Sequence, residues 1–286
     1  MTAPRAIVLS GLGINCERER AAALTCAGAR TKVLHINAFL QCPTSSLAGA
    51  SLVVFPGGFS FGDRLGAGQA LANRIRHRRI ADGLTAHAHL VRFVSSGGFL
   101  LGICNGFQVL AKLGLVPNTH GEHVQEVALA QNASGRFENR WCHLQVAASG
   151  PAGLFSAGDQ LELPVRHGEG RIVFRDSAVR TAVLDQSLNW LTYVSSHGAP
   201  TQTFPDNPNG SDLSCAGLSD RTGRVLGLMP HPEAFVTPYM HYNWPRRRRE
   251  SERLEIEADG LRLFRAVLHR IPQDGASTLD GSKGIA

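Results

Sequence analysis

The sequence predicts an α/β fold, in which an open parallel sheet is flanked by helices and carries an added antiparallel β layer. Two observations predict this class. Up to residue 113, short apolar runs alternate with stretches of helical periodicity, and such strand, helix, strand units form right-handed crossovers in parallel sheets. From about residue 122, short apolar or alternating stretches are separated by Gly, Pro, Asn and Asp, which is typical of antiparallel strands and loops.

The elements of the first half follow from local patterns. Residues 6–10 (AIVLS) form an apolar run of the kind found in buried parallel strands. Residues 17–29 place alanines and a leucine on one side of a helix that ends near Gly28. On the same grounds we expect strands at residues 31–36, 51–55 and 99–103. We also expect a helical arginine-rich stretch at 74–79, a helix that ends near residue 96, and helices at 105–113 and 261–271.

Length and composition bound the class of protein. The 286 residues are 43% hydrophobic and 18% charged, so the chain can bury a core without disulfides, and its six cysteines are scattered without a CxxC pair. We expect free thiols and a single domain at residues 1–272, followed by a polar, disordered tail at 273–286. No apolar run is long enough to span a bilayer and the start lacks the blocks of a secretory signal, which predicts a cytoplasmic protein without a membrane partner.

The net charge of +6 and the pI near 9.3 raise the question of nucleic-acid binding. Much of the excess lies in residues 74–79 (RIRHRR) and 246–249 (RRRR). No known DNA-binding module surrounds either stretch, so a solvated helix face and an exposed loop explain them at least as well. Nucleic acid is therefore not the expected partner, and a basic nucleic-acid-binding module is kept as an alternative function.

The most specific chemical feature is the segment 102–106 (GICNG), between an expected buried strand and a helix. Flanking glycines permit the cramped backbone of a nucleophile elbow, which places the central Cys104 at the carboxyl edge of the sheet. The helix that begins at Asn105 directs free N–H groups and its positive end at the sulfur, which favours the thiolate. A cysteine buried for packing is the ordinary alternative, but this context favours a nucleophile.

A nucleophilic thiol needs a partner for proton transfer, and His231 is the best candidate among the 12 histidines. It follows an apolar strand and stands between Pro230 and Pro232, which restrict the local backbone. Glu233 can bind the imidazole and set its tautomer, which would complete a triad with Cys104. Taken alone, this segment fits a surface turn with a solvated His and Glu equally well.

Acyl chemistry also needs hydrogen-bond donors for an oxyanion. Residues 56–60 (PGGFS) end a strand at the same expected edge and offer unencumbered N–H groups, and the amide of Asn105 is the natural second donor. A glycine turn without function is the alternative for any such pair. The sequence has no phosphate-binding loop, dinucleotide fingerprint, HExxH or EF-hand loop, so we expect no cofactor or metal in this chain.

With these residues in view, the chain resembles the class I glutamine amidotransferases, and among them the glutaminase subunits of phosphoribosylformylglycinamidine synthase. GIC-x-G-x-Q and HPE are common to the class, whereas PGGFSFGD, CNGFQ, RFENRW and HGEG are particular to this branch. The resemblance covers nearly the whole chain and implies a flavodoxin-like sheet. The matching blocks lie at residues 13–17, 56–63, 102–110, 132–141, 166–170, 227–233 and 259–264.

The resemblance also implies roles for individual residues. Cys104 would be the nucleophile, His231 its base and acid, and Glu233 the partner that orients the imidazole. Two departures from the branch are visible. Ala234 stands where many relatives have Arg, which puts a local salt bridge in doubt. Residues 235–258 form a long stretch before the last helix, so the resemblance does not define the surface that faces the partner. The remaining implied site residues are Gly58 and Asn105 as backbone oxyanion donors, and Gln108, Gly168 and Glu169 in the substrate pocket.

The activity that the resemblance implies is hydrolysis of L-glutamine to glutamate and ammonia. The ammonia would pass to a partner synthetase that converts formylglycinamide ribonucleotide into its amidine with ATP. A synthetase subunit and a small bridging subunit are therefore the expected partners, with ATP and Mg in the synthetase and no cofactor in this chain. A stand-alone cysteine amidase or hydrolase of the same fold is the principal alternative.

Overall fold

The computed structural model describes residues 3–147, 150–156, 158–250 and 257–272. Within them, the main sheet has nine strands in the order β2-β1-β3-β4-β11-β10-β9-β6-β7. The five strands from β2 to β11 are parallel, with the 2-1-3-4-5 order of flavodoxin-like folds. The strands are β1 (Arg5–Ser10), β2 (Arg30–His35), β3 (Leu52–Phe55), β4 (Phe99–Ile103), β5 (Val127–Gln131), β6 (Glu138–Val146), β7 (Gln160–His167), β8 (Glu169–Phe174), β9 (Leu191–Val194), β10 (Cys215–Ser219) and β11 (Val225–Leu228).

The antiparallel addition takes two forms. β10, β9, β6 and β7 continue the main sheet with antiparallel pairing beyond β11, and β5 and β8 form a separate two-stranded sheet. The predicted α/β class with an antiparallel addition is therefore confirmed. Most of that addition extends the parallel sheet at its edge, because β10 pairs directly with β11.

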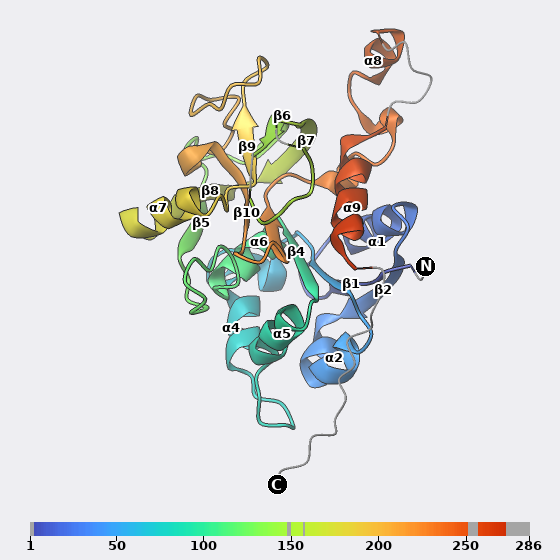
Figure 1. The fold of residues 1–286 in the computed structure, drawn as a ribbon, viewed down its shortest axis with the longest axis vertical. Helices are drawn as coiled ribbons and strands as arrows, with labels where there is room; N and C mark the ends of the chain where they lie inside the picture. The colour runs from blue at the N-terminus through green and yellow to red at the C-terminus, as the bar shows by residue number, and fades with distance from the viewer. Residues whose placement is uncertain (1–2, 148–149, 157, 251–256, 273–286) are drawn as a thin grey trace.

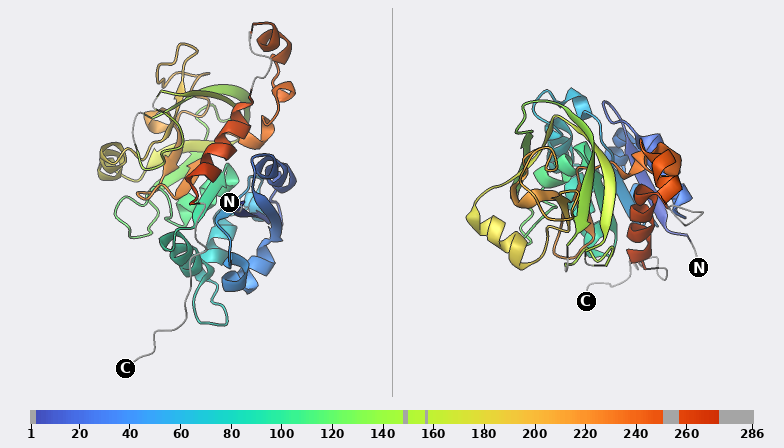
Figure 2. Two further views of the ribbon diagram at one scale, coloured as in Figure 1. Left: turned by 45° about the vertical axis from the view of Figure 1, so that its right-hand side comes forward. Right: turned by 90° about the horizontal axis from the view of Figure 1, so that it is seen from above.

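Helices cover the parallel half of the sheet (Figure 1, Figure 2). α1 packs beside α9, while α4 contacts both α5 and α6. The central strands β3 and β4 are buried at every position, which explains their continuous apolar sequences LVVF and FLLGI. The helices are α1 (Glu17–Cys26), α2 (Ile36–Gln41), α3 (Pro43–Leu47), α4 (Gln69–His77), α5 (Ala86–Ser95), α6 (Asn105–Lys112), α7 (Ser177–Asp185), α8 (Trp244–Glu250) and α9 (Asp259–Arg270), with the 3-10 turns η1 (Ser60–Asp63), η2 (Asp212–Ser214), η3 (Pro232–Ala234) and η4 (Pro238–Met240).

Local structure differs from expectation at two places. A helix, α7, lies within the region where strands and loops were expected to dominate. Its N-cap Asp176 accepts a hydrogen bond from the backbone N–H of Val179 at 2.8 Å, and Val179 and Val183 bury one face. Residues 246–249 were expected in an exposed loop but lie in α8, because arginine is a good helix former and Pro245 is tolerated in a first turn.

The arginine-rich stretches serve the fold in part. The Arg74 guanidinium lies over the Phe61 ring, 5.0 Å from its centroid, and Arg76 donates to the Lys112 carbonyl at 3.1 Å. Arg247 of α8 donates to Glu162 of β7 at 3.1 Å. α8 itself projects beyond the sheet at the top of Figure 1.

Several simple expectations can be checked directly. All six cysteines are free thiols, as predicted. Across the part of the chain that the structure describes, no helix is both long and apolar enough to cross a membrane. The expected tail at 273–286 lies outside the described residues, and the single domain at 1–272 stays a prediction.

Candidate active site

Three parallel strands end at the same edge of the sheet. Phe55 of β3 pairs with Gly102 of β4, and Ile103 of β4 pairs with Leu228 of β11. Cys104 therefore leaves β4 beside the Pro56 turn on one side and the segment leading to His231 on the other. The sheet register thus brings together residues that lie more than one hundred positions apart in the sequence.

Cys104 occupies a strained backbone conformation at the start of α6. Its φ of 55° and ψ of −111° lie in a region that non-glycine residues rarely adopt, and its N–H donates to the Leu228 carbonyl at 2.9 Å. The predicted elbow glycines are required sterically. A Cβ on Gly106 would lie 1.8 Å from the Phe55 carbonyl oxygen, and one on Gly102 would lie 2.8 Å from the backbone of Gly106.

His231 and Glu233 form the second part of the site. Both side chains are buried, and His231 Nδ1 lies 2.6 Å from Glu233 Oε1. The contact places a proton on Nδ1, which donates to the carboxylate. Nε2, which has no hydrogen-bond partner among the described residues, can then exchange protons with a reacting group. The alternative of a solvated surface turn is therefore wrong for this segment.

His231 is also close to Cys104. A Cβ on Gly57 would touch both residues, at 3.4 Å from Cys104 Cβ and 3.4 Å from His231 Cε1. Burial opposes the charging of His231, but the Glu233 carboxylate and the Cys104 thiol outweigh it and raise the pKa of the imidazole to about 9. The arrangement favours an imidazolium beside the Cys104 sulfur.

A buried arginine that sequence reasoning missed completes the charge arrangement. Arg20 Nη2 lies 2.8 Å from Glu233 Oε1, and neither side chain is appreciably exposed. Burial alone would raise the pKa of Glu233, but Arg20 and His231 lower it to about 2, so the carboxylate stays ionised. The cation that pairs with Glu233 therefore comes from α1, whereas position 234 holds Ala and supplies no charge.

The predicted oxyanion donors lie on two loops at this edge. Gly58 has a φ of +111° and forms an antiparallel bridge with Ile14. The bridge uses the N–H groups of Phe59 and Asn15, and no described residue accepts from the N–H of Gly58. The N–H of Asn105 is the first of α6 and has no acceptor within the helix. Both amides are therefore available to a ligand.

Gln108 links the elbow to the block at 166–170. Its Nε2 donates to the Glu169 carbonyl at 2.6 Å, and its Oε1 accepts from Asn105 Nδ2 at 2.9 Å. Asn105 in turn accepts from the Ser60 N–H at 3.2 Å. The structure therefore joins the predicted substrate-binding residues Gln108 and Glu169 in one network, in which the amide of Gln108 is held by protein groups.

The block that contains Gly168 lies directly against the sulfur. Cys104 Sγ is 3.7 Å from the Arg166 carbonyl oxygen, and the Gly168 carbonyl accepts from the Asn132 N–H at 2.9 Å. His167 is buried between them, with Nδ1 3.0 Å from Asn132 Oδ1. Sequence reasoning did not select His167 or Asn132, although both belong to blocks that carry the family resemblance.

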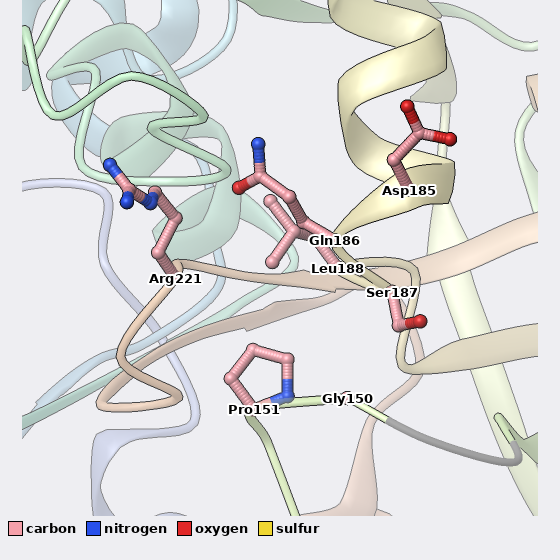
Figure 3. Close-up of a pocket in the computed structure, with 7 residues that line it drawn as sticks. All are labelled: Gly150, Pro151, Asp185, Gln186, Ser187, Leu188 and Arg221. Carbon is pink, nitrogen blue, oxygen red and sulfur yellow. The ribbon is translucent and has the colours of Figure 1, made fainter.

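Two further observations concern possible metal groups and the position of a surface hollow. Within the described ranges, no group of three or more His, Cys, Asp or Glu side chains is arranged to hold a metal ion. A surface hollow of about 580 Å³ is lined by Pro151, Gln186 and Arg221 (Figure 3). It lies at the opposite end of β11, since Arg221 precedes that strand, and therefore does not adjoin Cys104.

Comparisons with known proteins show which proteins this chain resembles. The profile of the CobB/CobQ-like glutamine amidotransferase domain matches residues 3–269. Phosphoribosylformylglycinamidine synthase subunit PurQ of Dehalococcoides mccartyi is 38% identical over 264 residues, covering 92% of this chain and 96% of that protein. Phosphoribosylformylglycinamidine synthase of Drosophila melanogaster is 37% identical over 245 residues, covering 84% of this chain but 17% of that protein. A chain in the structure of PurLQS from Thermotoga maritima is 28% identical, with a TM-score of 0.67 and coverage of 95% of this chain and 100% of that chain.

Proposed function

The chain belongs to the family of CobB/CobQ-like glutamine amidotransferase domains, and from this we propose that it is the glutaminase subunit of a phosphoribosylformylglycinamidine synthase. One relative with that name matches over 96% of its length, and in another the matching region is 17% of a longer synthase. One observation carries the chemistry: the strained Cys104 and the buried pair of His231 and Glu233 leave adjacent strands at one edge of the sheet.

Cys104, His231 and Glu233 would act as a catalytic triad. The Cys104 thiolate attacks the side-chain amide carbon of glutamine, and His231 Nε2 donates a proton to the departing nitrogen. Ammonia leaves and a γ-glutamyl thioester remains on the sulfur. His231 then takes a proton from water, the resulting hydroxide adds to the thioester, and glutamate is released with the thiolate restored. Glu233 keeps the imidazole in the required tautomer throughout.

The backbone amides of Gly58 and Asn105 would hold the oxyanion in both tetrahedral intermediates. Donors fixed at this position act without reorganisation, which is the reason that they stabilise the transition state more than the ground state. Gln108, Gly168 and Glu169 would form the wall of the glutamine pocket beside the sulfur. Their network to Asn105 and Asn132 fixes that wall before substrate arrives.

The ammonia needs a second active site, because free ammonia would be protonated and lost in bulk water. We propose that a synthetase subunit, with a small bridging subunit, receives it and supplies ATP and Mg, so that this chain needs no cofactor. The Drosophila melanogaster relative supports this arrangement, since the matching region is a minor part of a longer synthase. A cytoplasmic location fits these proposed partners.

Replacing Cys104 by Ala tests the proposal. The variant should lose glutamine-dependent activity by on the order of 10⁴-fold or more, while its complex with the synthetase still forms the amidine when ammonium salt is supplied. Cys42→Ala, at an exposed thiol, is the matched control. Glutamate release should also rise when the synthetase and its nucleotide substrate are added.

Two outcomes would contradict this function. Glutamate release that the synthetase never stimulates would favour a stand-alone amidase. Covalent labelling by a glutamine-like electrophile, located by mass spectrometry at Cys16 or Cys142 in place of Cys104, would overturn the site assignment. The variant Cys104→Ala should take up no label at all.

A further inference from the structure

Arg20 is a fully buried arginine that no step of the proposed reaction uses. Its side chain is 0% exposed, on a face of α1 that contacts α9 and η3. A guanidinium removed from water is costly unless hydrogen bonds and an opposite charge offset the loss of hydration. The contacts that retain it at this position therefore indicate what it does.

Those contacts join two parts of the active site. Nη2 lies 2.8 Å from Glu233 Oε1 and 3.5 Å from His231 Nδ1, while Nη1 donates to the Asn15 carbonyl at 3.0 Å. One nitrogen of the guanidinium thus binds the carboxylate that orients the imidazole, and the other binds the loop after β1. A planar guanidinium with donors in fixed directions suits this double contact better than an ammonium.

The loop after β1 leads directly to the proposed oxyanion donor. Asn15 N–H donates to the Gly57 carbonyl at 3.1 Å, and the neighbouring Ile14 bridges to Gly58. Arg20 is also close to that turn, because a Cβ on Gly57 would lie 3.2 Å from Nη2. The chain of contacts therefore runs from His231 through Glu233 and Arg20 to the Gly57 and Gly58 turn.

We propose that Arg20 is a positioning residue for the deamidation, which holds the Glu233 carboxylate against His231 and fixes it relative to the Gly58 turn. This inference rests on the proposed glutaminase function and adds to the triad a residue from α1. It predicts that the reaction depends on a side chain that touches neither glutamine nor the sulfur. Its effect should be on kcat, because it acts through the orientation of the proton-transfer group.

The charge of Arg20 also predicts a change in pH dependence. Arg20 lowers the pKa of Glu233, so an uncharged replacement should raise that pKa and let the carboxylate protonate at higher pH. A protonated Glu233 cannot hold the imidazolium, and activity should then be lost earlier as the pH falls. Among the described residues, other titratable groups near this pair include Cys16 at the start of α1, Cys104 after β4 and His167 at the end of β7. Glu19 and Arg166 act on Cys16 in turn.

The decisive comparison is Arg20→Met against Arg18→Met in the full-length protein. Arg18 lies on the same helix and is exposed. We expect Arg20→Met to lower kcat by on the order of 10²-fold with KM changed less than about threefold, and to move the acid limb of the pH profile to higher pH. Arg18→Met should match the parent protein in both. Equal kcat and an unshifted acid limb in Arg20→Met, with wild-type glutaminase activity present, would overturn the inference.

Arg20→Lys provides the second variant, should Arg20→Met fail to fold. It keeps a positive charge near Glu233 but cannot make both contacts, so the acid limb should stay in place while kcat falls by about tenfold. A wild-type kcat in Arg20→Lys would show that the link to Asn15 is unnecessary and would overturn the positioning role. In a Glu233→Gln background, Arg20→Lys should have less than about a threefold further effect, because both act on the same imidazole.

A readout without glutamine separates this inference from the proposed function. As the pH is lowered, the rate at which iodoacetamide alkylates Cys104 should begin to fall at a higher pH in Arg20→Met than in the parent protein. If the parent protein and its complex release no glutamate, the proposed function fails, and the alkylation profile still decides whether Arg20 controls the pair of His231 and Cys104. If alkylation profiles coincide while the parent protein is active, the inference about Arg20 alone fails.

Discussion

Glu233 Oε1 lies 2.6 Å from His231 Nδ1, with both side chains buried. An ionised carboxylate at this distance does two things. It fixes the proton on Nδ1, which leaves Nε2 for the reacting groups, and it stabilises the imidazolium that forms when the thiol ionises. The stabilisation of the imidazolium depends on the negative charge of Glu233.

Replacing Glu233 by Gln should therefore lower kcat by on the order of 10²- to 10⁴-fold, with the substrate pocket intact. The amide nitrogen of Gln can face Nδ1 and favour the wrong tautomer, and the Arg20 guanidinium loses its counter-charge. Glutamate release measured over a range of glutamine concentrations separates kcat from KM. The exposed Glu19→Gln on α1 is the control and should retain parent activity. A Glu233→Gln protein with kcat within a factor of three of the parent would exclude Glu233 from the triad.

The elbow should tolerate no side chain at Gly106. A Cβ there would lie 1.8 Å from the Phe55 carbonyl oxygen, and Gly106 of α6 and Phe55 of β3 are both buried, so neither can move without disturbing the packing of α6 on β3. We expect Gly106→Ala to lower the free energy of unfolding by about 3 kcal/mol, measured by urea denaturation.

Gly83→Ala is the control for backbone strain without a clash. Gly83 has a φ of +78° but nothing within 4 Å of a Cβ, so only the cost of the left-handed conformation applies. That cost is about 1 kcal/mol. Equal destabilisation by the two substitutions would show that packing at the elbow does not require glycine.

The nucleophile elbow and the segment after β11 could be predicted because their signals are local. Gly102 and Gly106 flank Cys104 in a pattern that few backbones other than a strand-to-helix turn require, and the prolines around His231 end a strand. The parallel sheet then placed both at one edge, as the class of fold demands. Two short signals and one rule of topology were sufficient to bring Cys104, His231 and Glu233 to one edge of the sheet.

Arg20 could not be predicted in this way. In the sequence it belongs to the charged run ERER, which is typical of a solvated helix face. Its burial depends on α9, more than two hundred residues away, covering α1 in the folded chain. The helix α7 was missed for a different reason. Its start is marked by a single capping side chain, Asp176, within a region where the sequence pattern is typical of strands.

Gln108 should act on substrate binding through the pocket wall. Its Nε2 donates to the Glu169 carbonyl at 2.6 Å, so Gln108→Glu keeps the shape but replaces a donor by an acceptor facing another acceptor. Leaving that carbonyl unpaired costs about 1 to 3 kcal/mol, part of which should appear as a KM for glutamine raised by about tenfold. Steady-state kinetics test this, with the exposed Gln41→Glu as control. An unchanged KM would show that the network does not shape the pocket.

The buried His167 should make the protein sensitive to acid. Burial and the positive charge of His231 lower the pKa of His167 to about 3, from an ordinary value near 6.5. As the pH falls, His167 therefore becomes protonated in the unfolded chain at a higher pH than in the folded protein. The stability contributed by the neutral ring is lost progressively from pH 6.5 towards pH 3. Burial also lowers the pKa of His87, to about 4, so His87 makes the protein less stable in acid in the same way. His87 is present in both the parent protein and a His167 variant, so its effect cancels when the two are compared.

His167→Gln removes this proton site but can still bind Asn132. Between pH 6.5 and pH 5, the parent protein should lose about 1.6 kcal/mol more unfolding free energy than His167→Gln, because His167 in the unfolded chain goes from half to almost fully protonated over this range. Urea denaturation at a series of pH values measures the difference. The exposed His120→Gln should keep the pH dependence of the parent. If His167→Gln and the parent lose stability in parallel, His167 must be protonated in the folded protein, and the site would then carry a second imidazolium beside His231.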